Sequence, residues 1–195
     1  KNILHNLLKT SVSILLIISI LLAFSGYFYS MEINSMLYHN VDPYWVRILS
    51  IMMLCFIPGS INYIFSSYLQ AIHREKLLLR IYFILALLSI LLNLIFVPIL
   101  KAEGSAWVFF IVQLLLFVIQ IFFIRSELNF GFNSIMRQLV FISTAFFLYF
   151  VIAKYCHFAI FYKLSLSAAL IFLMAFITGI ARITEFKKFL ALKKW

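Results

Sequence analysis

The stretch that decides the fold is residues 81–100, IYFILALLSILLNLIFVPIL, which contains no Asp, Glu, Lys or Arg. About 20 residues of α-helix rise roughly 30 Å, which is the thickness of the hydrocarbon core of a bilayer. The stretch does not alternate polar and apolar residues, as a strand of a membrane barrel would. A backbone in lipid has to bond its own N–H and C=O groups, which favours a helix. Residues 81–100 therefore predict a transmembrane α-helix.

On both sides of this stretch, five further runs are free of charged residues. The run at 138–153 is the shortest, and it can be lengthened because the side chains of Arg137 and Lys154 reach toward the interface. We predict spans near 11–29, 48–70, 79–100, 104–124, 138–155 and 162–181. The predicted fold class is all-α, an integral membrane bundle of about six transmembrane helices within residues 1–182. Residues 183–195 predict a basic amphipathic helix on the cytoplasmic leaflet.

The composition excludes a water-soluble protein. Hydrophobic residues make up 66% of the 195 residues and charged residues only 11%, whereas a soluble domain carries about 25% charged residues. The 16 Lys and Arg residues outnumber the 6 Asp and Glu residues, a balance that also occurs in nucleic-acid-binding proteins. Here the cations lie between apolar runs and form no stripe with aromatic residues. We therefore predict the lipid bilayer as a partner and no nucleic acid.

The cations are distributed unequally between the two sides of the predicted bundle. The terminal segments and the connections near residues 73–80 and 125–137 hold 12 Lys and Arg residues, and the other connections hold 4. Cytoplasmic segments carry the excess of Lys and Arg, so we expect both ends of this chain in the cytoplasm and the bundle in the cytoplasmic membrane. The sequence begins with Lys1 rather than Met, from which we expect that the start of the protein is missing.

No group of residues in the sequence indicates catalysis or metal binding. The motifs H-E-x-x-H, G-x-x-x-x-G-K-[ST] and G-x-S-x-G are absent from the chain. Away from their ends, the predicted spans contain no Asp, Glu, Lys or Arg, the side chains that usually mark ion pathways. Glu32, His39 and Asp42 share the connection near residues 30–46, where we interpret them as ordinary solvated loop residues. We expect no catalytic residue, no metal ligand, no cofactor and no enzymatic activity.

Uncharged polar residues inside the spans are the candidates for lining a substrate path: Asn62, Asn93, Gln113 and Gln120. Gln113 and Gln120 are seven residues apart, so they share one helix face. Such residues also form hydrogen bonds between helices, and the sequence leaves both roles open. Pro58, followed by Gly59, lies inside a span and predicts a kink.

A more specific pattern begins inside the stretch 81–100. Residues 93–106 read NLIFVPILKAEGSA and resemble the N-x4-P-x2-G-x2-G-[AS]-A connection between two helices of polysaccharide exporters, in the multidrug/oligosaccharidyl-lipid/polysaccharide flippase superfamily. The matching residues are Asn93, Pro98, Gly104, Ser105 and Ala106, and Lys101 stands where a glycine is usual. We expect Pro98 to close one helix. Gly104 and Ala106 begin the next helix with small side chains that permit close packing.

The flanking sequence and the position of the pattern extend the resemblance. Residues 67–76, SYLQAIHREK, resemble the family's L-x-A-x-G-[RK]-x-K loop, with His73 at a position where glycine is common. In this family the connection occurs once in each half of the protein. Only two predicted spans and a basic tail follow it here. The resemblance therefore implies the C-terminal half of an exporter, with the N-terminal lobe missing.

The resemblance also implies a function. A member of this family translocates lipid-linked oligosaccharide for cell-surface polysaccharide, such as the O-antigen of lipopolysaccharide, through a cavity between two lobes. Its expected partners are the lipid-linked oligosaccharide and the missing N-terminal lobe. One alternative is an integral membrane enzyme of envelope polysaccharide synthesis, a polymerase or an acyltransferase. Another is an accessory membrane subunit with no transport activity of its own.

Overall fold

The computed structural model describes residues 2–39, 42–128, 132–155 and 160–178, and these ranges contain no β-strand. Their helices are α1 (Asn2–Phe28), α2 (Ser30–Tyr38), α3 (Pro43–Leu54), α4 (Phe56–Ala71), α5 (Glu75–Leu128), α6 (Phe132–Tyr155) and α7 (Ile160–Ile177). The all-α bundle predicted from the sequence is confirmed. The tail predicted at 183–195 lies outside the described residues.

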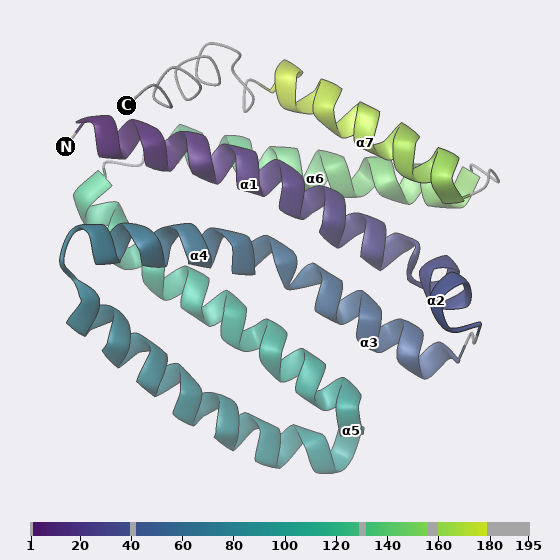
Figure 1. The fold of residues 1–195 in the computed structure, drawn as a ribbon, viewed down its shortest axis with the longest axis horizontal. Helices are drawn as coiled ribbons and strands as arrows, with labels where there is room; N and C mark the ends of the chain where they lie inside the picture. The colour runs from purple at the N-terminus through teal and green to yellow at the C-terminus, as the bar shows by residue number, and fades with distance from the viewer. Residues whose placement is uncertain (1, 40–41, 129–131, 156–159, 179–195) are drawn as a thin grey trace.

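Five helical segments in the described ranges are long and apolar enough to cross a membrane: Thr10–Phe28, Pro43–Ala71, Glu75–Ile124, Gln138–Tyr155 and Ile160–Ile177. The third has 50 residues and reverses at Lys101, where the backbone leaves the helical conformation. Figure 1 shows α5 folded into a hairpin, whose halves we name the first arm (residues 75–100) and the second arm (102–128). By length and composition, the chain is a multi-pass helical membrane protein.

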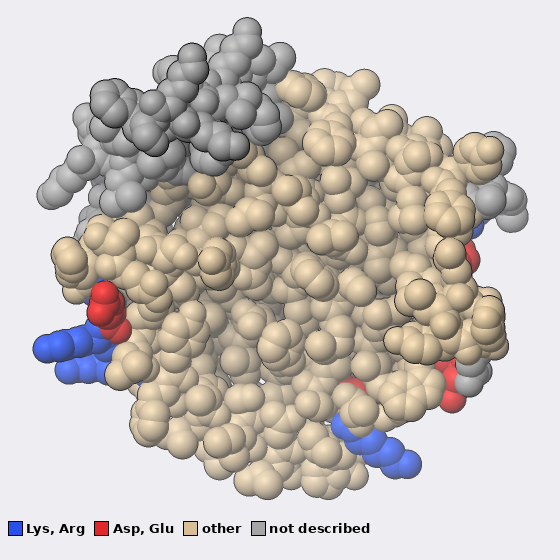
Figure 2. Space-filling model, in the orientation of Figure 1, with Lys and Arg blue, Asp and Glu red and all other residues tan. Residues whose placement is uncertain are grey.

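The helices run back and forth between two ends of the bundle (Figure 1). The start of α1 and the connection from α4 to α5 lie at one end, which we name the N-terminal end. The α2 helix and the turn of α5 lie at the opposite end, which we name the hairpin end. Figure 2 shows the charged side chains of the visible face near these ends rather than across its middle. A bilayer requires this separation, because a charge in the hydrocarbon core is costly.

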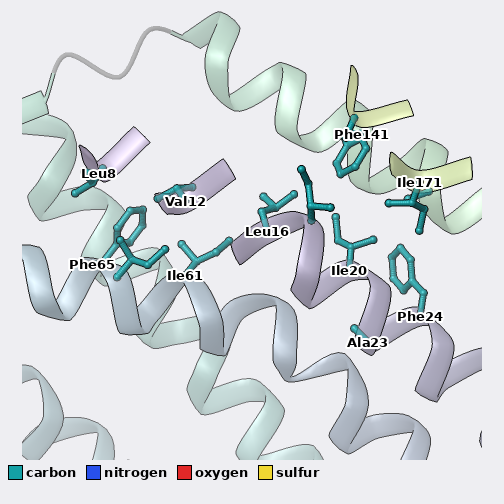
Figure 3. Close-up of a cluster of buried hydrophobic side chains, with 14 of the residues drawn as sticks. Leu8, Val12, Leu16, Ile20, Ala23, Phe24, Ile61, Phe65, Phe141 and Ile171 are labelled. Carbon is teal, nitrogen blue, oxygen red and sulfur yellow. The ribbon is translucent and has the colours of Figure 1, made fainter. Parts of the chain in front are cut away.

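The α1 helix lies at the centre of the bundle and contacts α2, α3, α4, α6 and α7. Leu16, Ile20 and Ala23 are at most 1% exposed, and their spacing places them on one helix face. Figure 3 shows them in the cluster that also contains Ile61 of α4 and Ile171 of α7. The small side chain of Ala23 lets a neighbouring helix come close.

Pro58 explains why α3 and α4 are separate helices. A proline lacks an N–H group, and its ring clashes with the carbonyl group four residues earlier. In this chain that residue is Leu54, the last residue of α3. The interruption between the two helices falls at Cys55, whose N–H donates a hydrogen bond to the carbonyl oxygen of Met52, three residues earlier, at 3.2 Å. The kink expected from Pro58 is therefore present, one turn before the proline.

The connection near residues 30–46 is largely helical, and its interpretation as a loop was wrong. It contains α2, and α3 begins at Pro43, before the predicted start of that span at residue 48. Asp42 caps α3 because its Oδ1 accepts a hydrogen bond from the N–H of Tyr44 at 2.9 Å. Proline suits the first helical position, where its missing N–H breaks no helical bond. The Asp-Pro pair was therefore a readable start signal.

Candidate functional site

Polar side chains from the span interiors meet between α4 and the second arm of α5. The Nδ2 of Asn62 donates to the backbone oxygen of Gln113 at 2.9 Å and to its Oε1 at 2.8 Å. One helical turn along α4, the Nε2 of Gln120 donates to the Oγ of Ser66 at 2.8 Å. Asn62 and Gln120 are 3% and 0% exposed, so these bonds lie inside the bundle. The structure thus brings three of the four path candidates together.

Ser66 extends this polar network to the first arm of α5. Its hydroxyl donates to the backbone oxygen of Asn62 at 2.7 Å and lies 2.7 Å from the Oη of Tyr82. A serine hydroxyl has one proton, so Tyr82 is the donor in the second contact. Tyr82 is 42% exposed. The network therefore joins α4 to both arms of α5 and reaches the outer surface of the hairpin.

Two oxygens of the network have no hydrogen-bond partner within the described part of the chain. They are the Oδ1 of Asn62 and the Oε1 of Gln120, and both are buried. A buried acceptor left unbonded costs about 1–3 kcal/mol. A water molecule or a hydroxyl group would be a suitable donor to either oxygen. The network can therefore hold helices together and accept hydrogen bonds, but it contains no charged group.

Asn93, the fourth path candidate, lies apart from the network on the first arm. Its Nδ2 donates to the backbone oxygen of Ser89 at 2.8 Å, which is a contact within its own helix. The side chain is half-buried. Asn93 therefore does not join α4 to α5, as Asn62 and Gln113 do.

Residues 93–106, which carry the family resemblance, form the turn between the two arms. Gly104 is buried, and a Cβ atom added there would lie 2.5 Å from the backbone oxygen of Phe96. Only glycine allows the arms to come this close, as the sequence predicted. Ala106 is also buried, at 4% exposed. The N–H of Ala102, which lacks a helical partner at the start of the second arm, donates to the Oη of Tyr44 at 3.0 Å and ties the turn to α3.

Pro98 does not close the first helix, which corrects the sequence-based expectation. The proline lies inside the helix, and the interruption comes at Lys101, with φ of 55° and ψ of −134°. A proline removes one hydrogen bond and bends a helix, whereas reversal of the chain needs a residue outside the helical conformation. Lys101 adopts a left-handed φ that glycine accepts most easily. This is the position where the family pattern usually has glycine.

The polar residues of the connection at the hairpin end have separate structural roles. The Oε1 of Glu32 pairs with the Nζ of Lys163 at 3.2 Å, and this ammonium group lies 5.7 Å from the centre of the Tyr29 ring. His39 ends α2 with φ of 52°, and Asp42 caps α3. Within the described ranges, no group of three or more His, Cys, Asp or Glu residues could hold a metal ion.

Ser66 and Tyr82 belong to the network but were not among the residues predicted to line a substrate path. Ser66 follows Asn62 by four residues, so the two lie on one helix face, and this spacing was a usable signal. Tyr82 gives no comparable signal, because tyrosine is common in membrane helices near the interface. Its role depends on how the first arm packs against α4, which the spacing of residues does not specify.

No protein-family model, curated protein or solved structure matches this chain. The geometry establishes the fold class and the polar contacts of the bundle.

Proposed function

We propose that this chain is a lobe of a flippase that translocates lipid-linked oligosaccharide across the cytoplasmic membrane for cell-surface polysaccharide synthesis. The main support for the proposal is the tight turn at residues 93–106. This segment, which resembles the exporters' connection, is where α5 reverses direction. Its Gly104 is buried where the backbone of Phe96 leaves no room for a side chain. The small residues of the pattern therefore have a physical use in this chain.

The kind of polar group inside the bundle also supports transport of an uncharged glycan rather than an ion. Asn62, Gln113 and Gln120 are neutral amides, which can donate and accept hydrogen bonds. Ion-coupled transporters usually carry ionisable side chains within the membrane, and the predicted spans contain no Asp, Glu, Lys or Arg away from their ends. We therefore propose that this chain does not itself hold a coupling carboxylate.

On this proposal, the path for the glycan lies between this bundle and a second lobe of the same protein. An oligosaccharide needs polar groups to replace its water across about 30 Å of hydrocarbon. In this chain, Asn62 bonds to Gln113 and Gln120 bonds to Ser66. The N–H groups of these amides are already hydrogen-bonded inside the bundle, so few polar groups are left to bind a sugar. The partner lobe would supply the other wall of the path.

We also propose that the N-terminal end of the bundle faces the cytoplasm, which places both ends of this chain there. Exposed cations stand at this end beside the start of α5: Arg74, Lys76 and Arg80. Arg47, Lys101, Lys154 and Lys163 belong to the opposite end, and over the whole sequence the distribution is 12 Lys and Arg residues against these 4. The excess of Lys and Arg is the usual mark of the cytoplasmic side.

Reconstitution into liposomes tests this function. A fluorescent lipid-linked oligosaccharide is placed in the outer leaflet, and its protection from an external reagent is followed over time. We expect protection to rise and saturate with the full-length gene product, and we expect no flipping with these 195 residues alone. Mass spectrometry of the extracted lipid is done in parallel and should show an unchanged glycan.

Three results would overturn the proposal, and they differ in what they imply. An elongated or acylated glycan would identify an envelope enzyme instead of a transporter. Saturable flipping by these 195 residues alone would show that copies of this chain build the path without a second lobe. Absence of both flipping and chemical change with the full-length product would favour an accessory subunit.

A further inference from the structure

A cavity of about 400 Å³ lies between α1, α4, the second arm of α5 and α6. Val12 and Leu16 of α1 line one side, and Ile61 and Phe65 of α4 line another (Figure 3). The volume falls in the range of about 300–1,000 Å³ that small-molecule sites occupy. None of the hydrogen-bonded residues of the polar network lines this cavity. It is therefore a separate feature of the bundle.

The wall of the cavity consists almost entirely of hydrocarbon. The second arm contributes residues such as Leu114 and Phe117, and α6 contributes Leu139, Ile142 and the amide side chain of Gln138. A buried water molecule needs about two to four polar partners, which this wall does not supply. An empty void would leave its lining without van der Waals partners. A hydrocarbon occupant avoids both penalties.

The dimensions of the cavity suit one extended chain. Along the second arm its wall runs from Leu114 to Ile124, a distance of about 15 Å at 1.5 Å per residue. This is half of the roughly 30 Å hydrocarbon core, which corresponds to one leaflet. An acyl chain that spans one leaflet matches this length.

The position of the cavity indicates which leaflet supplies the chain and what headgroup it carries. The wall reaches Phe65 on α4 and Gln138 on α6, each six residues from the end of its helix at the N-terminal end. Six helical residues rise about 9 Å, which brings the cavity close to the headgroup level. Near that end the sequence carries Arg74, Lys76 and Arg80 beside Glu75, and Arg125 and Arg137 beside Glu127. Their excess positive charge attracts an anionic headgroup.

We propose that the cavity binds one acyl chain of an anionic phospholipid from the leaflet at the N-terminal end. The acyl chain lies between α1, α4, the second arm of α5 and α6, and the phosphate lies on the side of Lys76 and Arg80. Gln138 is placed to donate a hydrogen bond to the ester carbonyl of the lipid. This lipid is a resident of the bundle and not a transported substrate, so the inference does not depend on the proposed transport function.

Photocrosslinking in liposomes tests the proposal. The full chain is reconstituted in phosphatidylcholine with a trace of phosphatidylglycerol that carries a diazirine at the middle of one acyl chain. Peptides are mapped by mass spectrometry after irradiation. We expect crosslinks in residues 57–65 and 114–124 to exceed those in the membrane-exposed residues 87–100 by about tenfold, and unlabelled phosphatidylglycerol to compete them away.

Variants that fill the cavity provide the decisive comparison. Leu139→Trp at the rim, where Leu139 is 52% exposed, and Ile61→Trp deeper inside should each remove most of the crosslinks in residues 57–65. Because the rim tolerates a larger side chain, Leu139→Trp keeps the test valid even if Ile61→Trp unfolds. Leu94→Trp, at a position 68% exposed on the first arm, is the matched control and should leave them unchanged.

Three outcomes would overturn the proposal. Uniform labelling of all membrane-facing helices would mean that the lipid is only annular. Crosslinks in residues 57–65 that survive Leu139→Trp would mean that they do not come from the cavity. Equal competition by added phosphatidylcholine would contradict the assignment to an anionic lipid.

Discussion

The α1 helix and the first arm of α5 are both long apolar helices, yet they lie in opposite surroundings. In α1, Ile20 is 0% exposed and the helix is surrounded by five others. In the first arm, Leu94 is 68% exposed, and no residue after Leu85 is buried. Near the start of this arm, Leu78 joins the main core, whereas Ile81 and Leu85 form with Leu116 of the second arm a small separate cluster.

The comparison shows that apolar character places a helix in the membrane but does not decide whether other helices or lipid surround it. Lipid tails are as apolar as leucine, so hydrophobicity does not press one membrane helix against another. Close packing does so instead, and α1 has the small residues that allow it. Ala23 is fully buried, and a Cβ atom on Gly26 would collide with the side chain of Met53 in α3. The first arm has buried side chains only near its start, and its backbone at Phe96 lies against Gly104 of the second arm.

The largest expected effect comes from truncating side chains of equal size to alanine, one in α1 and one in the first arm of α5. Ile20→Ala leaves a void in a fully packed site and should lower the free energy of unfolding by about 2–3 kcal/mol. Leu94→Ala faces lipid, so its effect should stay within about 0.5 kcal/mol. Unfolding of both variants by sodium dodecyl sulfate in mixed micelles measures the two values. Equal losses would mean that the first arm is packed against protein and that the contrast is wrong.

At Phe96 the first arm is packed as tightly as α1, because its backbone there lies against Gly104 of the second arm. Gly104→Leu puts a side chain against the backbone of Phe96 and should cost about 2 kcal/mol by overpacking. Ser105→Leu, at the exposed neighbouring position, is the control and should change little. The same unfolding assay applies. A Gly104→Leu protein that inserts and unfolds like the parent would show that the arms do not approach closely there.

Lys101 allows the opposite change, a gain in stability. Its φ of 55° is unfavourable for any residue with a Cβ atom, so Lys101→Gly should raise the free energy of unfolding by about 1 kcal/mol. Lys101→Ala removes the charge but keeps the Cβ atom, and it should give no comparable gain. If Lys101→Ala stabilises the protein as much as Lys101→Gly does, the gain comes from removing the charge and not from relieving the backbone conformation.

The smallest effect concerns how the second arm is held to α4. A double-mutant cycle with Asn62→Leu and Gln113→Leu should give a coupling of about 0.6 kcal/mol, which is the average for hydrogen bonds between membrane helices. The pair Asn62 and Asn93 should show no coupling, because Asn93 bonds within the first arm. A coupling near zero for the first pair would mean that the side-chain bond between Asn62 and Gln113 does not help to hold the second arm to α4.

Features that depend on neighbouring residues were predictable from the sequence. Residues 81–100 identify a membrane helix because length and lack of charge are local properties. The turn of α5 was expected at residues 98–104 because Pro98 and Gly104 both mark it, and it falls between them at Lys101. The α2 helix was missed because its nine residues mix polar and apolar side chains, and so short a helix depends on its tertiary contacts.

Features that depend on helix packing were not predictable. Asn62 and Gln113 are 51 residues apart, so their hydrogen bond follows from the rotation and depth of two helices. The sequence could only leave open whether such amides line a path or join helices. In the same way, the cavity beside Pro58 depends on how four helices pack together, and no local sequence pattern predicts it.

The most direct test of the account is whether α5 crosses the membrane twice, as a hairpin in a bundle whose ends alternate. Single cysteines at Ser35, Glu75 and Lys101, in a background where Cys55 and Cys156 are alanine, are exposed to a membrane-impermeant maleimide in whole cells. We predict labelling at Ser35 and Lys101 in intact cells, and at Glu75 only after permeabilisation. Labelling of Glu75 and Lys101 from the same face would contradict the hairpin and with it the antiparallel bundle.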